Sequence, residues 1–438
     1  MSIMDKLKKN SKLKATEVLS ESKFFNDKDM VPTEVPMVNV ALSGSMDGGL
    51  APGLTVLAGP SKHFKTSFAL LMASAYMKKY KDSVMLFYDS EFGSPQAYFE
   101  QFEIDTSRVL HTPITNVEEL KFDLIGQLEG LERSDKVVIV IDSIGNLASK
   151  KEMEDAINEK SVADMSRAKA LKGLFRMTTP YLAMKDIPLL AVNHTYQEMG
   201  LFPKAVVSGG TGIYYSADNI WILGRRQNKK GTEVMGYDFV INVEKSRYVK
   251  EKSKIPITVS WEGGVQKLSG LLEVAMAGGY ARKPSNGWYE GINPSTGEVL
   301  TGKTREAGTI EEDFWNPIFE QTDFKEFVKK QYTIGYKDQI SMDDIIDPLY
   351  YYMQYIKFGF GRALRDASRL IQNKHLDRNK ALDFVKKYDG EFPEEKLYEI
   401  LEYMDCSLVE FNENIEKHRN KEIWHLSGNE YKLNFTIK

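Results

Sequence analysis

Short apolar runs alternate with longer helix-like segments between residues 54 and 265 of this chain. The runs consist mainly of Val, Ile and Leu and lack a polar face, which is typical of strands buried on both sides. Strands separated by helices indicate an α/β core with a mostly parallel sheet. The later runs lie closer together and have polar flanks, so we expect antiparallel edge strands there. The predicted strands are 54–58, 84–88, 137–141, 189–193, 219–223, 239–243 and 257–260, and the predicted helices are 67–79, 94–102, 117–131 and 161–184.

The segments on either side of this core have a different character. Residues 1–30 are lysine-rich and then amphipathic, which predicts a short helix that either packs on its own domain or docks on a neighbouring copy. Residues 268–345 are rich in turn residues and predict a small α+β subdomain. Beyond these, the pattern is helical to about His418 and then strand-like at 424–426 and 431–437. The predicted domains are 1–30 (arm), 31–267 (nucleotide-binding core), 268–345 (subdomain) and 346–438 (helical extension).

Composition excludes several classes of protein. The net charge is -4, with 27% charged and 42% hydrophobic residues, so any binding to nucleic acid depends on local basic loops rather than on an overall field. The single cysteine, Cys406, excludes an intramolecular disulfide and a multi-cysteine metal site. No apolar stretch approaches the ~20 residues of a membrane span, and the start of the chain lacks the apolar core of a signal peptide. We therefore expect a cytoplasmic protein without a membrane partner.

A phosphate-binding loop is predicted between the first strand and the following helix. In such a loop the backbone N–H groups surround a β-phosphate, Lys65 reaches the β- and γ-phosphates, and the Thr66 hydroxyl ligates Mg²⁺. Phe64 stands where the general motif has glycine, so a chance strand-turn-helix stays open as the alternative. The predicted nucleotide-binding residues of the loop are Gly59, Pro60, Ser61, Lys62, His63, Phe64, Lys65, Thr66 and Ser67.

Acidic residues follow two other buried strands, where the ligands of parallel sheets collect. Asp142 ends the strand 137–141 and is the candidate for holding Mg²⁺ beside Thr66. Glu91 follows the strand 84–88 and is the candidate general base, with Asp89 as its rival. Tyr98 begins the next helix and either stacks on adenine or packs in the core.

The ordered set of these segments resembles the core of RecA-type recombinases. The set consists of residues 59–66, 88–91, 138–143 and 193–194. More narrowly, the chain is similar to the UvsX-like recombinases of T-even phages from its first residue to about residue 345. That family shares the Phe-for-Gly phosphate loop and the segments 22–25, 142–151 and 243–247. The resemblance implies an ATP- and Mg²⁺-dependent DNA strand-exchange protein that forms filaments. Its implied partners are single-stranded DNA, homologous double-stranded DNA, further copies of itself, and single-stranded-DNA-binding and mediator proteins.

The resemblance also assigns roles to individual residues. Lys65 and Thr66 bind phosphate and Mg²⁺, Glu91 is the catalytic carboxylate, and Asp142 is the Walker B acid. His194 replaces the polar residue, glutamine in many relatives, that senses the γ-phosphate; a histidine that only caps the strand is the alternative.

Lys245 and Arg247 match basic residues that reach the neighbouring protomer's ATP site. Cations supplied in this way would make hydrolysis depend on assembly. Without the resemblance, a solvated basic run is the alternative.

Two long polar segments, 150–160 and 195–212, are predicted to be loops that bind DNA, and the resemblance places the DNA loops there. They contain the cations, backbone donors and aromatic faces that single-stranded DNA requires. Because the first segment is nearly charge-balanced, we expect the next helix to share the phosphate contacts. The predicted DNA-binding residues are Lys150, Lys151, Arg167, Lys169, Tyr196, Phe202, Lys204, Gly209 and Gly210.

Residues from about 348 onward resemble the helical C-terminal end of N-acetyl sugar amidotransferases. The ATP-pyrophosphatase signature of that enzyme family, Ser-Gly-Gly-x-Asp-Ser, is absent from the sequence. We therefore expect a non-catalytic helical module. A recombinase is the leading hypothesis, and the alternatives are a hexameric RecA-fold helicase and, from the C-terminal segment, a sugar amidotransferase.

Overall fold

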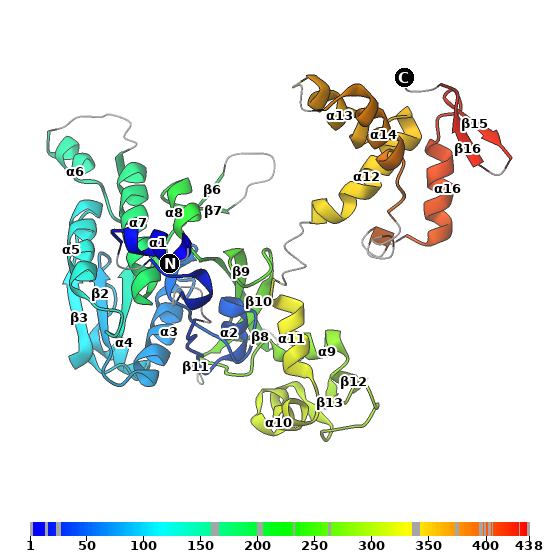
Figure 1. Cartoon of the computed structure of the whole chain (residues 1–438). Helices are drawn as coiled ribbons and strands as arrows, with labels where there is room; N and C mark the ends of the chain where they lie inside the picture. The colour runs from blue at the N-terminus through cyan, green and yellow to red at the C-terminus, as the bar shows by residue number, and fades with distance from the viewer. Residues whose placement is uncertain are drawn as a thin grey trace. The chain divides into compact units, whose positions relative to one another are not determined.

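The computed structural model forms two compact units, Met1–Ile334 and Gly335–Lys438, and each is described by itself (Figure 1). The sequence-based boundary at residue 346 falls inside a helix of the second unit, Met342–Phe358. None of the helices in the described part of the chain has the length and apolarity needed to cross a membrane. The structure describes residues 3–13, 16–22, 28–158, 166–198, 205–230, 233–261, 264–334, 342–372, 376–393, 397, 400–401, 404, 406–428 and 430–435.

A nine-stranded sheet forms the centre of the first unit, in the order β11-β10-β9-β8-β1-β5-β4-β2-β3. Six neighbouring strands run parallel: β1 (Gly53–Ala58), β2 (Val84–Asp89), β3 (Val109–Pro113), β4 (Val137–Asp142), β5 (Pro188–Asn193) and β8 (Asn219–Lys230). The remaining strands pair antiparallel: β9 (Glu233–Ser246), β10 (Lys254–Ser260) and β11 (Gly264–Val265). The predicted mostly parallel sheet with antiparallel edge strands is confirmed.

Helices cover both faces of this sheet (Figure 1). Along β1, Leu57 packs into one hydrophobic cluster, whereas its neighbour Val56 packs into the other, because successive side chains of a strand point to opposite faces. The first cluster includes residues of α2 (Pro36–Ser43), α3 (Lys65–Lys79) and α4 (Gln96–Gln101). The second includes residues of α5 (Val117–Gly130), α7 (Ser166–Lys185) and α8 (Thr211–Ser216).

One prediction about local structure is wrong. The segment 150–160 is not a loop: its described part contains helix α6 (Lys150–Ile157), which a capping box starts. The Ser149 hydroxyl accepts a hydrogen bond from the Glu152 N–H at 3.1 Å, and the Glu152 carboxylate accepts one from the Ser149 N–H at 2.6 Å. The short helix predicted within residues 1–30 is α1 (Ile3–Asn10), and the amphipathic stretch that follows contains the short 3-10 helix η1 (Leu19–Glu21).

The second predicted DNA segment contains a short hairpin. Strands β6 (Thr195–Gln197) and β7 (Ala205–Val207) pair antiparallel, and α8 begins at Thr211. The hairpin directly follows β5, so its base lies beside the carboxyl end of that strand. Phe202 and Lys204 lie outside the described residues.

The subdomain after the sheet is α+β, as predicted. It packs Trp315, Phe324 and Tyr280 into the same hydrophobic cluster as the sheet, so it extends the core of the first unit. Its elements are α9 (Leu271–Gly278), β12 (Ala281–Ser285), β13 (Trp288–Gly291), β14 (Thr304–Arg305), η3 (Glu306–Ile310), α10 (Glu312–Gln321) and α11 (Phe324–Tyr332).

The second unit is mainly helical and ends in a two-stranded sheet, as the sequence predicts. The indole N–H of Trp424 donates to the Ile356 carbonyl at 2.8 Å and ties this sheet to the first long helix. Asp389 accepts hydrogen bonds from the N–H groups of Gly361 and Ala363, each at 2.9 Å, which joins the end of α14 to the start of α13. The described elements are α12 (Met342–Phe358), α13 (Arg362–Gln372), α14 (Arg378–Tyr388), α16 (Leu408–His418), β15 (Trp424–Ser427) and β16 (Glu430–Leu433).

Candidate functional site

The loop between β1 and α3 turns through two residues in the left-handed region. Lys62 and Phe64 both have φ of 60°, a conformation that side chains rarely adopt and that costs about 1–2 kcal/mol. The Phe64 ring stacks on Phe239 with the centroids 5.0 Å apart and meets Phe68 edge-on at 5.3 Å. These aromatic contacts join the loop to the core and offset the backbone strain. The position before the lysine is therefore filled by a ring that packs, where the general motif has glycine.

Lys65 and Thr66 begin α3 beside the ends of two strands. The Lys65 ammonium donates a hydrogen bond to the Pro60 carbonyl at 2.8 Å, across the loop. Burial lowers its pKa, and the charges of Glu91 and Asp142 oppose that shift. The Thr66 hydroxyl donates to Oδ2 of Asp142 at 2.8 Å. The predicted phosphate-binding lysine and both predicted Mg²⁺ ligands are thus brought together.

The Asp142 carboxyl has one oxygen without a partner. Oδ2 accepts the hydrogen bond from Thr66, whereas Oδ1 is buried and has no hydrogen-bond partner within the described part of the chain. Burial raises the pKa of this carboxyl to about 6, and the charges of Glu91 and Asp89 act in the same direction. A buried polar atom without a partner is costly, and a divalent cation would supply one. Carboxylate and hydroxyl oxygens suit Mg²⁺, so the residues present fit this ion.

Glu91 is held by three polar side chains. Its Oε1 accepts a hydrogen bond from the Ser143 hydroxyl at 2.6 Å and from the Asn146 amide at 3.2 Å, and it lies 3.1 Å from Nε2 of His194. The His194 contact, more than the Ser143 one, lowers the pKa of Glu91 to about 2. Sequence reasoning missed Ser143 and Asn146 as site residues. Their position directly after the β4 strand end was the available signal.

Asp89, the rival of Glu91, is engaged elsewhere. Its Oδ1 accepts hydrogen bonds from the N–H groups of Glu91 and Phe92, at 3.0 and 2.7 Å, and its Oδ2 lies 3.2 Å from Nε2 of His111. The Asp89 carboxylate therefore shapes the turn that presents Glu91.

A cavity of about 560 Å³ opens between these elements, a size within the 300–1,000 Å³ that small-molecule sites occupy. Tyr98 lines it, and its hydroxyl forms a hydrogen bond with Ser67. The predicted residues that line the cavity are Ser61, Lys62, His63, Phe64, Lys65, Thr66, Ser67, Glu91, Tyr98, Asp142 and His194. Gly59 and Pro60 are not among the lining residues; they form the start of the loop.

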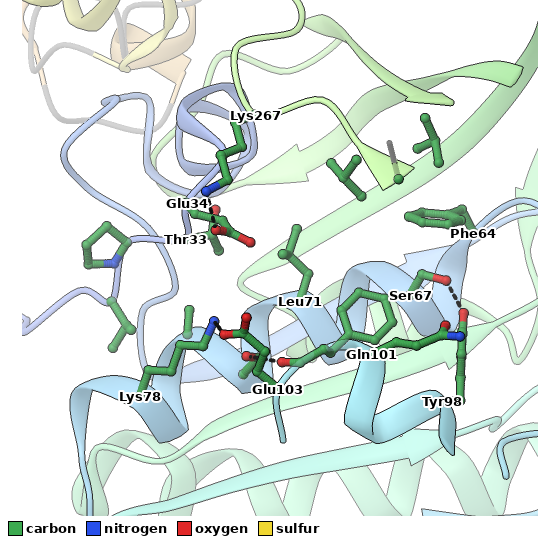
Figure 2. A pocket seen from close by; sticks show the side chains of 18 of the residues that line it. Thr33, Glu34, Phe64, Ser67, Leu71, Lys78, Tyr98, Gln101, Glu103 and Lys267 are labelled. Atoms are coloured by element: carbon green, nitrogen blue, oxygen red, sulfur yellow. Dashed lines mark hydrogen bonds and ion pairs between the residues drawn. The ribbon is translucent and has the colours of Figure 1, made fainter. Parts of the chain in front are cut away.

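A larger groove of about 960 Å³ adjoins this cavity and shares Phe64, Ser67, Tyr98 and Gln101 with it. Figure 2 shows the Ser67–Tyr98 hydrogen bond at one end and the pairs Lys78–Glu103 and Lys267–Glu34 farther along the groove. Apolar side chains such as Leu71 lie between them. Tyr98 thus lies between the phosphate loop and a broad, partly apolar surface.

Lys245 and Arg247 lie away from the chain's own phosphate loop. Ser246 pairs with Asn219, which in turn pairs with Thr55 near the start of β1, whereas the phosphate loop follows the end of β1. The Arg247 guanidinium lies 2.6 Å from the Asp218 carboxylate. The Lys245 ammonium donates to the Tyr214 carbonyl, and burial lowers its pKa. These two residues are therefore not part of the nucleotide cavity of their own chain.

The described residues of the predicted DNA segments differ in exposure. Lys150 and Lys151 are exposed on α6, Lys169 is exposed on α7, and Tyr196 in β6 is 54% exposed. Gly209 and Gly210 have φ of 102° and 78°, which favours glycine at the turn before α8.

Arg167 differs from these residues because it is partly buried. Its guanidinium donates four hydrogen bonds within the protein, to the Ile144, Gly145 and Leu147 carbonyls and to the Ser208 hydroxyl.

Comparison with known proteins gives three matching regions. Residues 3–266 match the RecA N-terminal domain family. Residues 268–328 match the C-terminal domain of the bacteriophage T4 recombination and repair protein. Residues 321–437 match the C-terminal domain of LPS biosynthesis proteins like WbpG.

Individual relatives agree with the first two matches. The chain is 49% identical over 354 residues to the "Recombination and repair protein" of Enterobacteria phage T4, covering 79% of this chain and 90% of that protein. It is 24% identical over 327 residues to "Protein RecA" of Chloroherpeton thalassium, covering 72% and 86%, and 25% identical over 285 residues to that of Thermus aquaticus, covering 64% and 78%. The extent of these matches and the phosphate loop they include show that the chain belongs to the RecA family.

Proposed function

We propose that this chain is a DNA-dependent ATPase that forms filaments on single-stranded DNA and pairs that strand with a homologous duplex. Its roles would be recombination, repair and recombination-dependent replication in the cytoplasm, with single-stranded-DNA-binding and mediator proteins as partners. The observation that carries the proposal is the cluster of Lys65, Thr66, Asp142 and Glu91 around one cavity, in a chain 49% identical to a protein named for recombination and repair. A ring-forming helicase would use the same cluster, but the matches to a recombination and repair protein and to RecA do not favour it.

The residues of the cavity have distinct roles in hydrolysis. Residues 59–67, Lys65 among them, bind the phosphates of ATP, and Tyr98 contacts the base. Thr66 and Asp142 hold Mg²⁺, which neutralises charge on the phosphate oxygens. Glu91 accepts a hydrogen bond from the attacking water and orients it; the low pKa keeps this carboxylate ionised.

His194 fixes the orientation of that carboxylate. Its Nε2 lies 3.1 Å from the same oxygen of Glu91 that Ser143 contacts. The histidine is followed directly by the β6–β7 hairpin. A change at the γ-phosphate can therefore reach the hairpin through one residue.

Assembly completes the site in this proposal. Lys245 and Arg247 lie outside their own cavity and would supply positive charge to the site of the neighbouring protomer. The N-terminal arm would contact a neighbouring copy, because Ile3, Met4 and Leu7 of α1 are 78%, 55% and 62% exposed. An amphipathic helix with its apolar side exposed favours such a contact.

DNA would bind at the end of the first unit that carries α6, the start of α7 and the hairpin (Figure 1). Lys150, Lys151 and Lys169 would contact phosphates, and the exposed Tyr196 would stack on a base. Gly209 and Gly210 would offer backbone donors at the hairpin base. The helical extension would be a non-catalytic module.

The test is the rate of ATP hydrolysis with and without single-stranded DNA, for the wild-type protein and the Lys65→Ala variant. The proposal expects stimulation of the wild type by DNA and no hydrolysis by the variant, which loses the cation that binds the phosphates. Circular dichroism of the variant controls for its folding. A wild-type rate that does not respond to DNA contradicts the proposal.

A further inference from the structure

The Arg167 side chain joins two segments that are distant in sequence. It lies at the start of α7, between the segment that follows β4 and the turn that follows β7. Its guanidinium donates from Nε to the Leu147 carbonyl (2.7 Å), from Nη2 to the Ile144 and Gly145 carbonyls (2.9 Å each) and from Nη1 to the Ser208 hydroxyl (3.3 Å). Four of the five N–H groups of the guanidinium are therefore committed to protein acceptors.

The first of these segments holds the catalytic carboxylate. Ser143 and Asn146 both donate to Oε1 of Glu91, at 2.6 and 3.2 Å. Arg167 binds the backbone carbonyls beside them. A displacement of the guanidinium would therefore shift both donors of Glu91.

The second segment leads to the same carboxylate by another route. The Ser208 N–H donates to the His194 carbonyl at 2.9 Å, and the Ser208 carbonyl accepts from the Asn193 amide at 2.7 Å. His194 in turn contacts Oε1 of Glu91. Arg167 thus closes a ring of contacts that runs from Glu91 through both segments and back.

The two routes also touch each other near Glu91. A Cβ atom on Gly145 would lie 2.3 Å from Cδ2 of His194, so only glycine lets the His194 ring pack there. The ring of contacts is therefore closely packed at one end and held by Arg167 at the other.

We propose that Arg167 is a positioning residue that couples the β6–β7 hairpin to Glu91, so that DNA bound at the hairpin changes the rate of hydrolysis. This inference rests on the proposed function, in which the hairpin binds DNA. It replaces the expectation that Arg167 contacts phosphate, because its donors are engaged within the protein. The guanidinium holds the hairpin base and the Ser143–Asn146 donors in one arrangement, and a shift of the hairpin alters both.

The test compares Arg167→Met with Lys169→Met, two residues along the same helix and exposed. For each, we measure the ratio of ATPase rates with saturating single-stranded DNA and without DNA. We also measure DNA affinity over a salt series with a poorly hydrolysed ATP analogue. For Arg167→Met we expect the ratio to fall at least about fivefold, the range of typical coupling effects, with an unchanged salt slope. For Lys169→Met we expect the slope to decrease by roughly 0.7, the effect of one lost phosphate contact, with the ratio retained.

Two outcomes overturn the coupling role. If Arg167→Met has the wild-type ratio of ATPase rates with and without DNA, the Arg167 contacts do not couple the hairpin to Glu91. If its salt slope is lowered as in Lys169→Met, Arg167 is a phosphate ligand. If wild-type hydrolysis itself does not respond to DNA, the proposed function fails and the coupling role fails with it.

A second variant keeps the test decisive if Arg167→Met does not fold. Ser208→Ala removes only the hydroxyl that Arg167 contacts at 3.3 Å and leaves the backbone bonds of Ser208 in place. We expect a smaller decrease of the ratio and no change of the salt slope. An unchanged ratio in Ser208→Ala overturns the proposal.

Discussion

Replacing Phe64 separates the two opposing effects that this residue has on stability. Its left-handed backbone costs free energy, whereas its ring packs on Phe239 and Phe68. Phe64→Ala removes the ring and keeps the strain. Phe64→Gly removes both and restores the glycine of the general phosphate-loop motif.

The expected magnitudes follow from these contacts. Two aromatic pairs contribute about 0.5–1.5 kcal/mol each, and the half-buried ring adds about 1 kcal/mol of apolar burial. Phe64→Ala should therefore lower the free energy of unfolding by about 2–4 kcal/mol. Glycine relieves about 1–2 kcal/mol of strain and costs about 0.5–1 kcal/mol of chain entropy. At the midpoints of these ranges, Phe64→Gly should be more stable than Phe64→Ala by about 0.75 kcal/mol and still less stable than the wild type.

The assay is unfolding in urea followed by tryptophan fluorescence, because Trp221 and Trp315 are buried in the cluster that Phe64 packs against. The urea concentrations at the unfolding midpoints are compared between variants whose free energy of unfolding falls with urea concentration at the same slope. Ala75→Gly in α3 is the matched control, since at a helical position glycine should destabilise by about 1 kcal/mol instead. The reasoning is refuted if Phe64→Ala is at least as stable as Phe64→Gly, or if Phe64→Gly equals the wild type.

Two further predictions concern the nucleotide site. Burial raises the pKa of Asp142 to about 6, so the carboxyl is protonated below that pH. Mg²⁺ titrations should therefore show an affinity for Mg²⁺ that falls as the pH drops through 6, with Asp142→Asn as the control. An affinity that does not depend on pH would argue against Asp142 as a ligand. Arg247→Ala should bind ATP without hydrolysing it. Mixing it with Lys65→Ala should restore ATP hydrolysis, because Arg247→Ala supplies an intact nucleotide cavity and Lys65→Ala supplies the Arg247 cation. Mixtures as inactive as their components would exclude action between protomers. The Arg247–Asp218 pair is exposed on the arginine side, so its loss should cost only about 0–1 kcal/mol of stability.

The buried strands could be predicted because both of their faces are apolar. Strand β3 could not be predicted in this way, because it lies at an edge of the sheet, where its residues are largely exposed and apolar and polar residues are mixed along the strand. The spacing of Ser149 and Glu152, which form a capping box, is a signal for helix α6 in the sequence, whereas the charge-rich composition of the segment favours a loop.

Contacts between distant segments could not be predicted. Lys65, Thr66, Glu91 and Asp142 follow strand ends, so topology alone brings them together. The four hydrogen bonds of Arg167 depend instead on the path of the segments around it. The same holds for Phe64, whose partner Phe239 comes from an antiparallel strand far along the chain.

The central claim, that this chain is a recombinase, is tested most directly by the formation of joint molecules between single-stranded DNA and a homologous duplex. The account predicts ATP-dependent joint molecules for the wild type, none with a duplex of unrelated sequence, and none for Lys65→Ala. Hydrolysis that DNA stimulates without any homology-dependent joint molecules would contradict the claim.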